Sequence, residues 1–139
     1  MTHRAPALVS LLTPKSQVVW VSASGSVEQA LERMRPNGYS AVPLLSDDGR
    51  YVGILSASDL LWYLSPPTPT PTSAPLMLVP RRMRDSAVHV ESSLATLIRR
   101  TLDQSFVAVV DDETTFLGIV RRRSVLEYCL NVTPQLLTR

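Results

Sequence analysis

The chain has 139 residues, of which 45% are hydrophobic and 19% charged, so it can bury a core and is not a disordered chain. A formal net charge of only +2 excludes the strongly basic surface of a non-specific nucleic-acid or membrane binder. One cysteine excludes an internal disulfide framework. Neither a signal peptide nor a membrane span is apparent, so we expect a cytoplasmic protein with no nucleic-acid and no membrane partner.

The first half of the chain predicts a unit of the order β-α-β-β-α. A short apolar run at residues 18–21 is typical of a strand, and a helix is expected to begin at Ser26, whose hydroxyl can cap it. Two β-rich runs follow, joined by a hairpin turn at residues 46–49, which read Ser-Asp-Asp-Gly. A second helix is expected over residues 58–64.

The segment that follows, residues 65–80, holds six of the eleven prolines. Prolines at this density cannot continue a helix or a central strand, because they lack the backbone N–H group and fix φ. We therefore predict a connector of extended character, on the surface of the protein.

The second half repeats the pattern of the first. Ser93 matches Ser26 at a spacing of 67 residues, and Gly118 matches Gly53 at a spacing of 65. The two copies therefore differ by two residues in the loop before each glycine. A last helix is expected over residues 122–130. Because the two halves repeat one pattern, we expect them to form two copies of the same structural unit.

The fold class that we predict is α/β, because each half alternates short strands with helices. A half with three short strands and two helices buries too little surface to be stable alone. We expect two β-α-β-β-α repeats packed together into one module. The predicted ranges are 8–64 for repeat 1, 65–80 for the Pro/Thr-rich linker and 81–132 for repeat 2.

At this point the sequence resembles the family of cystathionine-β-synthase (CBS) domains. The family signature is an apolar strand that ends near proline, followed by Gly-φ-x-(Ser/Thr)-x-x-Asp, where φ is apolar. Residues 38–45 (GYSAVPLL) and 53–59 (GILSASD) match both elements, and the second copy repeats them less closely. That second copy is also similar to the small stand-alone CBS pairs of bacteria that act as cyclic di-AMP receptors. The resemblance implies a pseudo-symmetric pair with two ligand clefts, each combining strands of one repeat with the signature turn of the other.

The first implied cleft pairs the signature turn of repeat 1 with the strands of repeat 2. Its candidate residues are Ser56, Asp59, Val88, His89 and Phe106. An Asp here could accept hydrogen bonds from both hydroxyls of a ribose, and a Ser at a helix start could bind phosphate, which suits AMP, ADP or ATP. The alternative is that the Ser and Asp only cap the helix and that the His packs or lies on the surface.

The second implied cleft pairs the strands of repeat 1 with the turn of repeat 2. Its candidate residues are Gln17, Val18, Val19, Tyr39, Ser40, Arg121, Arg122 and Arg123. The turn departs from the signature, since Arg121 occupies the Ser/Thr position and Ser124 the Asp position. A 3′,5′-cyclic dinucleotide has no free 3′ hydroxyl and carries two phosphodiesters, so losing the Asp and gaining arginines favours it. A solvated basic helix start remains the alternative, and Tyr39 could stack on a base or fill the core.

The function predicted from these residues is a regulatory adenine-nucleotide sensor that binds cyclic di-AMP and signals to an effector protein in trans. An AMP, ADP or ATP sensor and a ligand-free interaction module remain as alternatives. Surplus apolar residues on the last helix of each repeat, together with the resemblance, predict a homodimer. Neither a catalytic constellation nor metal-ligand spacing is present in the sequence, so we expect no enzyme activity, no cofactor and no metal.

Overall fold

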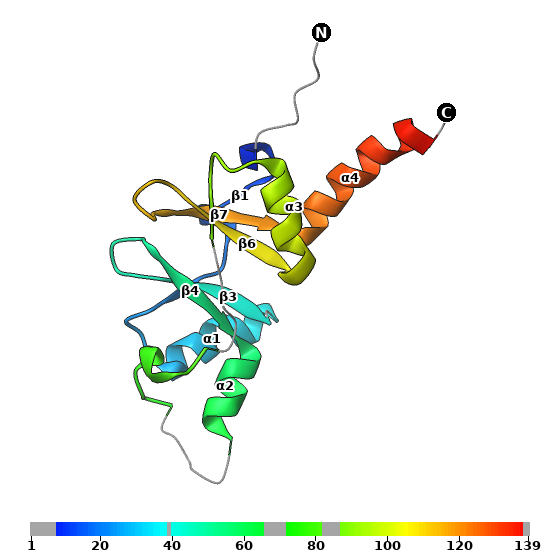
Figure 1. The fold of residues 1–139 in the computed structure, drawn as a ribbon. Helices are drawn as coiled ribbons and strands as arrows, with labels where there is room; N and C mark the ends of the chain where they lie inside the picture. Colours follow the sequence, from blue (N-terminus) through cyan, green and yellow to red (C-terminus); the bar gives the residue numbers. More distant parts are fainter. Residues whose placement is uncertain (1–7, 39, 66–71, 82–86, 138–139) are drawn as a thin grey trace. The chain divides into compact units, whose positions relative to one another are not determined.

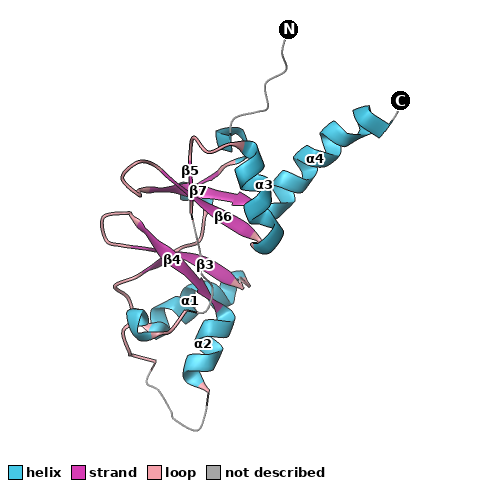
Figure 2. Cartoon of the chain, in the orientation of Figure 1, coloured by secondary structure: helices cyan, strands magenta, loops and turns pink. Residues whose placement is uncertain are grey.

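The computed structural model describes residues 8–38, 40–65, 72–81 and 87–137, and it divides into two compact units. Among the described residues, unit 1 comprises 8–18, 87–112 and 117–137, and unit 2 comprises the rest: the chain from 19 to 81 and residues 113–116. Each unit combines short strands with helices (Figures 1 and 2), and the predicted α/β fold class is confirmed.

Unit 2 contains a three-stranded sheet in the order β2-β3-β4 and two α-helices. Its elements are β2 (Val21–Ser22), α1 (Val27–Asn37), β3 (Ala41–Leu45), β4 (Tyr51–Ser56) and α2 (Ala57–Leu64). β2 pairs parallel with β3 through the crossover helix α1, and β3 pairs antiparallel with β4. The predicted β-α-β-β-α order therefore holds, although the first strand is shorter than the apolar run at residues 18–21.

Helix α1 begins at the predicted serine cap and ends at a glycine. The Ser26 hydroxyl accepts a hydrogen bond from the Gln29 N–H group, and the Gln29 side chain accepts one from the Ser26 N–H group, which completes a capping box. At the other end Gly38 adopts the left-handed conformation with φ of 63°, which glycine adopts without steric cost. The buried face of the helix, with Val27, Ala30 and Met34, packs into the core of unit 2.

The described end of the Pro/Thr-rich connector is an integral part of unit 2. Residues Leu76–Leu78 form a 3₁₀ helix, η3, and the Leu76 and Val79 side chains are 2% and 4% exposed within the core. The Leu76 N–H group donates to the Gly25 carbonyl oxygen at 2.9 Å. The expectation of a surface connector is therefore wrong for this part, because the Leu76 and Val79 side chains are buried in the core of unit 2. Residues 66–71 lie outside the described part of the chain.

Unit 1 contains a four-stranded sheet in the order β1-β7-β6-β5, with helices α3 and α4 side by side (Figure 1). Its elements are the 3₁₀ helices η1 (Leu8–Leu11) and η2 (Lys15–Gln17), strands β1 (Thr13–Pro14), β5 (Val88–His89), β6 (Phe106–Val110) and β7 (Phe116–Arg121), and helices α3 (Leu94–Asp103) and α4 (Arg122–Leu137). The Ser93 hydroxyl caps α3 by accepting from the Thr96 N–H group, as predicted. Helix α4 continues seven residues past the predicted end.

The N-terminal segment belongs to unit 1, with the second repeat, although its sequence precedes the first repeat. β1 pairs antiparallel with β7, with Thr13 opposite Ile119 and Pro14 opposite Gly118, and Leu8 is 2% exposed in the unit 1 core. This strand carries no strand signal in the sequence, since it is only two residues long and contains a proline. The compact units are thus not the same as the sequence repeats. The predicted division into repeat 1 (8–64), linker (65–80) and repeat 2 (81–132) stays a prediction.

Candidate functional site

In unit 2 several predicted ligand residues lie at one end of the sheet. The starts of the parallel strands β2 and β3 and the end of the antiparallel strand β4 share that edge. Val19 and Ser40 precede the two strand starts, and Ser56 ends β4 opposite Ala41. The Ala57 N–H group donates to the Ser40 carbonyl oxygen at 2.7 Å, and this hydrogen bond joins the start of α2 to the residue before β3. Ser40 is exposed there, so its side chain can be contacted by a ligand.

At the start of α2, Ser56 and Asp59 form a buried capping box. The Ser56 hydroxyl accepts from the Asp59 N–H group, and Asp59 Oδ2 accepts from the Ser56 N–H group, both at 3.1 Å. Asp59 is only 2% exposed, and its charge lies at the positive end of the helix. These two side chains therefore have a structural role in the conformation described.

Unit 1 has the equivalent edge, formed by the starts of β5 and β6 and the end of β7. β5 and β6 are parallel, and the Arg122 N–H group donates to the Ser105 carbonyl oxygen at 2.8 Å. This bond is the counterpart of the one between Ala57 and Ser40. Val88 is 3% exposed and packs in the core, whereas Phe106 is half-buried at the start of β6.

The turn between β7 and α4 places three arginines in succession, where the unit 2 turn has Ser56, Ala57 and Ser58. Arg122 Nε donates to the Thr101 carbonyl oxygen at 2.7 Å, near the C-terminus of α3, where a cation is favourable. Arg123 Nε lies 3.0 Å from Glu127 Oε1, and the Arg123 side chain is 87% exposed. Arg122 is thus anchored to the fold, whereas the contact that Arg123 makes within the described part of the chain is a surface ion pair of the i,i+4 type.

Two buried polar residues near this turn were missed in the sequence. Thr101 and Gln104 are 5% and 8% exposed, and Gln104 Oε1 has no hydrogen-bond partner among the described residues. A water molecule or a ligand N–H group would satisfy this acceptor. The one sequence signal for them is their polarity beside the apolar positions of α3, which by itself does not predict a role.

His89 is tied to its own unit by two hydrogen bonds. Its Nδ1 accepts from the Glu91 N–H group at 3.0 Å, and its Nε2 is hydrogen-bonded to Asp112 Oδ1. A neutral ring with the proton on Nε2 satisfies both contacts. The imidazole therefore links the end of β5 to the turn between β6 and β7.

The remaining predicted residues are less informative. Gln17 is exposed at the end of η2, and Val18 is 9% exposed. Among the described residues, neither is hydrogen-bonded to the arginine turn. Tyr39 lies outside the described residues.

A match to a protein-family model shows which family this chain belongs to. The sequence model of the CBS domain matches residues 9–66 and 81–131, which is most of the chain. The chain belongs to the CBS domain family. No curated protein sequence matches this CBS protein.

Solved structures share the fold of this CBS protein at low sequence identity. A crystal structure of CbpB in complex with c-di-AMP has a TM-score of 0.84 and 21% identity, covering 96% of this chain and 90% of that one. The CbpB protein of Listeria monocytogenes in complex with c-di-AMP has a TM-score of 0.81 and 23% identity, covering 94% and 99%. CBSX2 in complex with AMP has a TM-score of 0.73 and 22% identity, covering 93% and 99%. At these identities the likeness shows the fold.

Across its described residues, this CBS protein has neither a metal-ligand cluster nor a membrane-spanning helix. No group of three or more His, Cys, Asp and Glu side chains could hold a metal ion there. Nor is any helix in that part of the chain both long and apolar enough to span a bilayer. Asp47 and Asp48 lie at the exposed hairpin turn, where the Ser46 hydroxyl bonds to Asp48 and lowers the pKa of its carboxyl group.

Proposed function

We propose that this CBS protein is a regulatory adenine-nucleotide sensor whose ligand is cyclic di-AMP and whose output is read by an effector protein in trans. CBS domains are regulatory modules and in general do not catalyse reactions. The observation that carries the choice of ligand is the turn Arg121–Arg122–Arg123, where the counterpart turn of unit 2 has a Ser56–Asp59 capping box.

The arginine turn suits two phosphodiester groups. Each guanidinium has five N–H donors, so the single Nε bond of Arg122 to Thr101 leaves its terminal nitrogens to face a phosphate. The exposed ion pair of Arg123 with Glu127 contributes only about 0.3–0.5 kcal/mol, so exchanging it for a phosphate costs little. No acidic side chain replaces the missing Asp in this turn, since Ser124 stands there.

The buried acceptor of Gln104, close in sequence to the residues that Arg122 contacts, is a second observation in favour of an adenine ligand. Its Oε1 lacks a partner among the described residues, and its neighbour Ser105 accepts the Arg122 N–H group. An adenine presents an exocyclic amino group, which is a hydrogen-bond donor. A ligand that combines adenine with phosphate matches both the acceptor and the arginines. The c-di-AMP complexes of two CbpB structures with this fold support the same choice.

Thermal unfolding with a panel of nucleotides tests this proposal. With cyclic di-AMP at a hundredfold over its dissociation constant, we expect the folded state to gain about 2.7 kcal/mol and Tm to rise by several degrees. Arg123→Ala should weaken binding about 10- to 100-fold, because a hydrogen bond to a charged group is worth about 1.5–3 kcal/mol. Arg99→Ala removes the same charge from an exposed position on α3 and should leave the shift intact.

A second candidate function is an energy sensor that binds AMP, ADP or ATP. Asp59 is present at the family position for ribose recognition, and CBSX2, which shares the fold, is in complex with AMP. A shift with AMP that Asp59→Asn abolishes would support this candidate against cyclic di-AMP. The asparagine oxygen can still accept from the Ser56 N–H group, so this variant should keep the cap. No shift with any nucleotide would leave a ligand-free interaction module.

The exposed apolar residues support a homodimer as the working form. On α2 the Leu61 and Trp62 side chains are 68% and 62% exposed, and on α4 Leu126 and Leu130 are 56% and 57% exposed. Beside Leu61 an apolar groove of about 460 Å³ runs between α1 and α2. Surface of this kind is stabilised when a second copy covers it.

Leu61→Glu is expected to dissociate this dimer. A carboxylate in an apolar interface should weaken association by about 2 kcal/mol or more, which is roughly thirtyfold. Light scattering after gel filtration should give twice the chain mass for the parent and one chain for the variant. The matched control is Leu102→Glu, because Leu102 is 73% exposed on α3. A parent that is monomeric at high concentration contradicts the prediction.

A further inference from the structure

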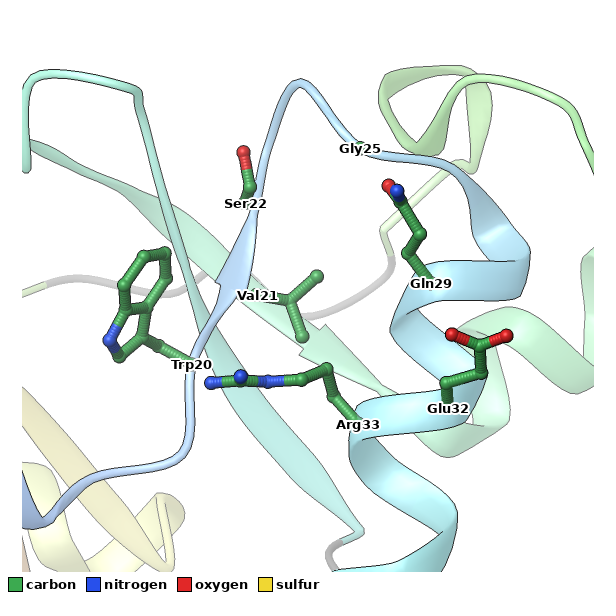
Figure 3. A pocket seen from close by; sticks show the side chains of 7 residues that line it. All are labelled: Trp20, Val21, Ser22, Gly25, Gln29, Glu32 and Arg33. Atoms are coloured by element: carbon green, nitrogen blue, oxygen red, sulfur yellow. The ribbon is translucent and has the colours of Figure 1, made fainter.

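A pocket of about 390 Å³ opens between β2 and α1 in unit 2 (Figure 3), extending from the start of β2 to the side chains of α1. Val21 and Trp20 provide its apolar surface, and Gln29, Glu32 and Arg33 line it from one face of α1, at helical spacings of three and four. The volume is in the range of small-molecule sites. None of these residues belongs to the signature elements of the family.

The pocket carries one positive and one negative group that do not neutralise each other. Among the described residues, neither the Glu32 carboxylate nor the Arg33 guanidinium makes a hydrogen bond or an ion pair. Arg33 instead lies over the indole of Trp20, with its Cζ atom 5.9 Å from the ring centroid, and Figure 3 shows it extending from α1 toward that ring. The Gln29 Oε1 atom is fixed by the Ser26 N–H group, so its amide nitrogen is the end that can donate to a ligand.

We infer that this pocket binds a small zwitterion with an apolar side chain, namely a free apolar α-amino acid. The guanidinium of Arg33 and the amide of Gln29 bind the carboxylate, for which a planar fork of N–H donors is well suited. Glu32 binds the ammonium group, and the apolar side chain packs on Val21 and the face of Trp20. A ligand with only one charge would leave either Glu32 or Arg33 without a partner in the complex, so the pocket selects for both charges.

Tryptophan fluorescence gives a direct readout, because the chain has only two tryptophans. In a Trp62→Phe background, which keeps an aromatic side chain at that position of α2, Trp20 is the only tryptophan. We expect L-leucine to change its emission saturably. N-acetyl-L-leucine lacks the ammonium group and L-leucinamide lacks the carboxylate, so each should bind at least about tenfold more weakly.

The charge variants make the assignment specific. Glu32→Gln should weaken L-leucine binding at least about tenfold and abolish the preference over N-acetyl-L-leucine, and Arg33→Gln should do the same relative to L-leucinamide. Glu28→Gln changes an exposed carboxylate in the first turn of the same helix, outside the pocket, and should change nothing. Circular dichroism with an unchanged unfolding midpoint verifies that each variant is folded.

Two results would overturn the inference: no saturable change with L-leucine, or equal affinity for L-leucine and its two single-charge analogues. Since the readout is Trp20 and no nucleotide is added, the outcome is independent of whether cyclic di-AMP binds.

Discussion

Gly118→Ala is expected to destabilise the protein by about 3 kcal/mol or more, since two costs add at one position. Gly118 has φ of 155°, a backbone region that is almost restricted to glycine. A Cβ atom there would also lie 2.1 Å from the Thr13 carbonyl oxygen, and backbone cannot yield as a flexible side chain can. The pairing of β1 with β7 should therefore be lost, and the free energy of unfolding in urea should fall accordingly.

Gly38→Ala is the matched control for this variant. Gly38 also has a positive φ, of 63°, but no atom lies within 4 Å of the position that its Cβ would take. Only the conformational strain applies, so we expect a loss of about 1 kcal/mol. If the two variants were equally stable, the close approach of β1 to Gly118 would be absent in solution.

Leu76→Ala is the second large effect, with an expected loss of about 2–5 kcal/mol. Leu76 is 2% exposed in the core of unit 2, where its removal leaves a cavity that the neighbours fill only in part. A loop free on the surface would tolerate the same change within about 0.5 kcal/mol. Urea unfolding followed by circular dichroism separates the two outcomes.

The adjacent residue Met77 provides the control for Leu76. Met77 is 54% exposed in the same 3₁₀ helix, so Met77→Ala should lie within about 0.5 kcal/mol of the parent. Equal effects at both positions would mean that the connector does not pack as described.

The helix caps and the order of elements could be predicted from the sequence because their causes are local. A serine hydroxyl satisfies backbone N–H groups three residues away, so Ser26 and Ser93 mark helix starts wherever the helix then packs. Hydrophobic periodicity and the repeat predicted the α/β class, whereas the CBS family was predicted from the resemblance of residues 38–45 and 53–59 to the family signature. The strands were less well bounded, since β2 and β5 are each only two residues long.

The candidate site was predictable in its residue types but not in their contacts. The arginine turn stood out because it departs from the family signature at Arg121 and Ser124. Two contacts depend on the packing of α3 against the turn. Arg122 donates to the carbonyl oxygen of Thr101, 21 residues earlier in the sequence, and Gln104 buries an acceptor near the same end of α3. The ligand role of the predicted residues remains a prediction for the binding experiments.

The sequence by itself determined the repeat, the helix starts and the chemistry of the two signature turns, since these depend on neighbours along the chain. Tertiary structure alone decided that β1 joins the second repeat at Gly118, that Leu76 is a core residue and that Trp20 faces Arg33. Each of these is a contact between segments far apart in sequence or without a periodic pattern. After the local helices and strands have formed, some apolar surface and some backbone N–H and C=O groups are still exposed to water. Long-range contacts form where these groups can be buried or hydrogen-bonded together, which depends on the packed fold and not on neighbours along the chain.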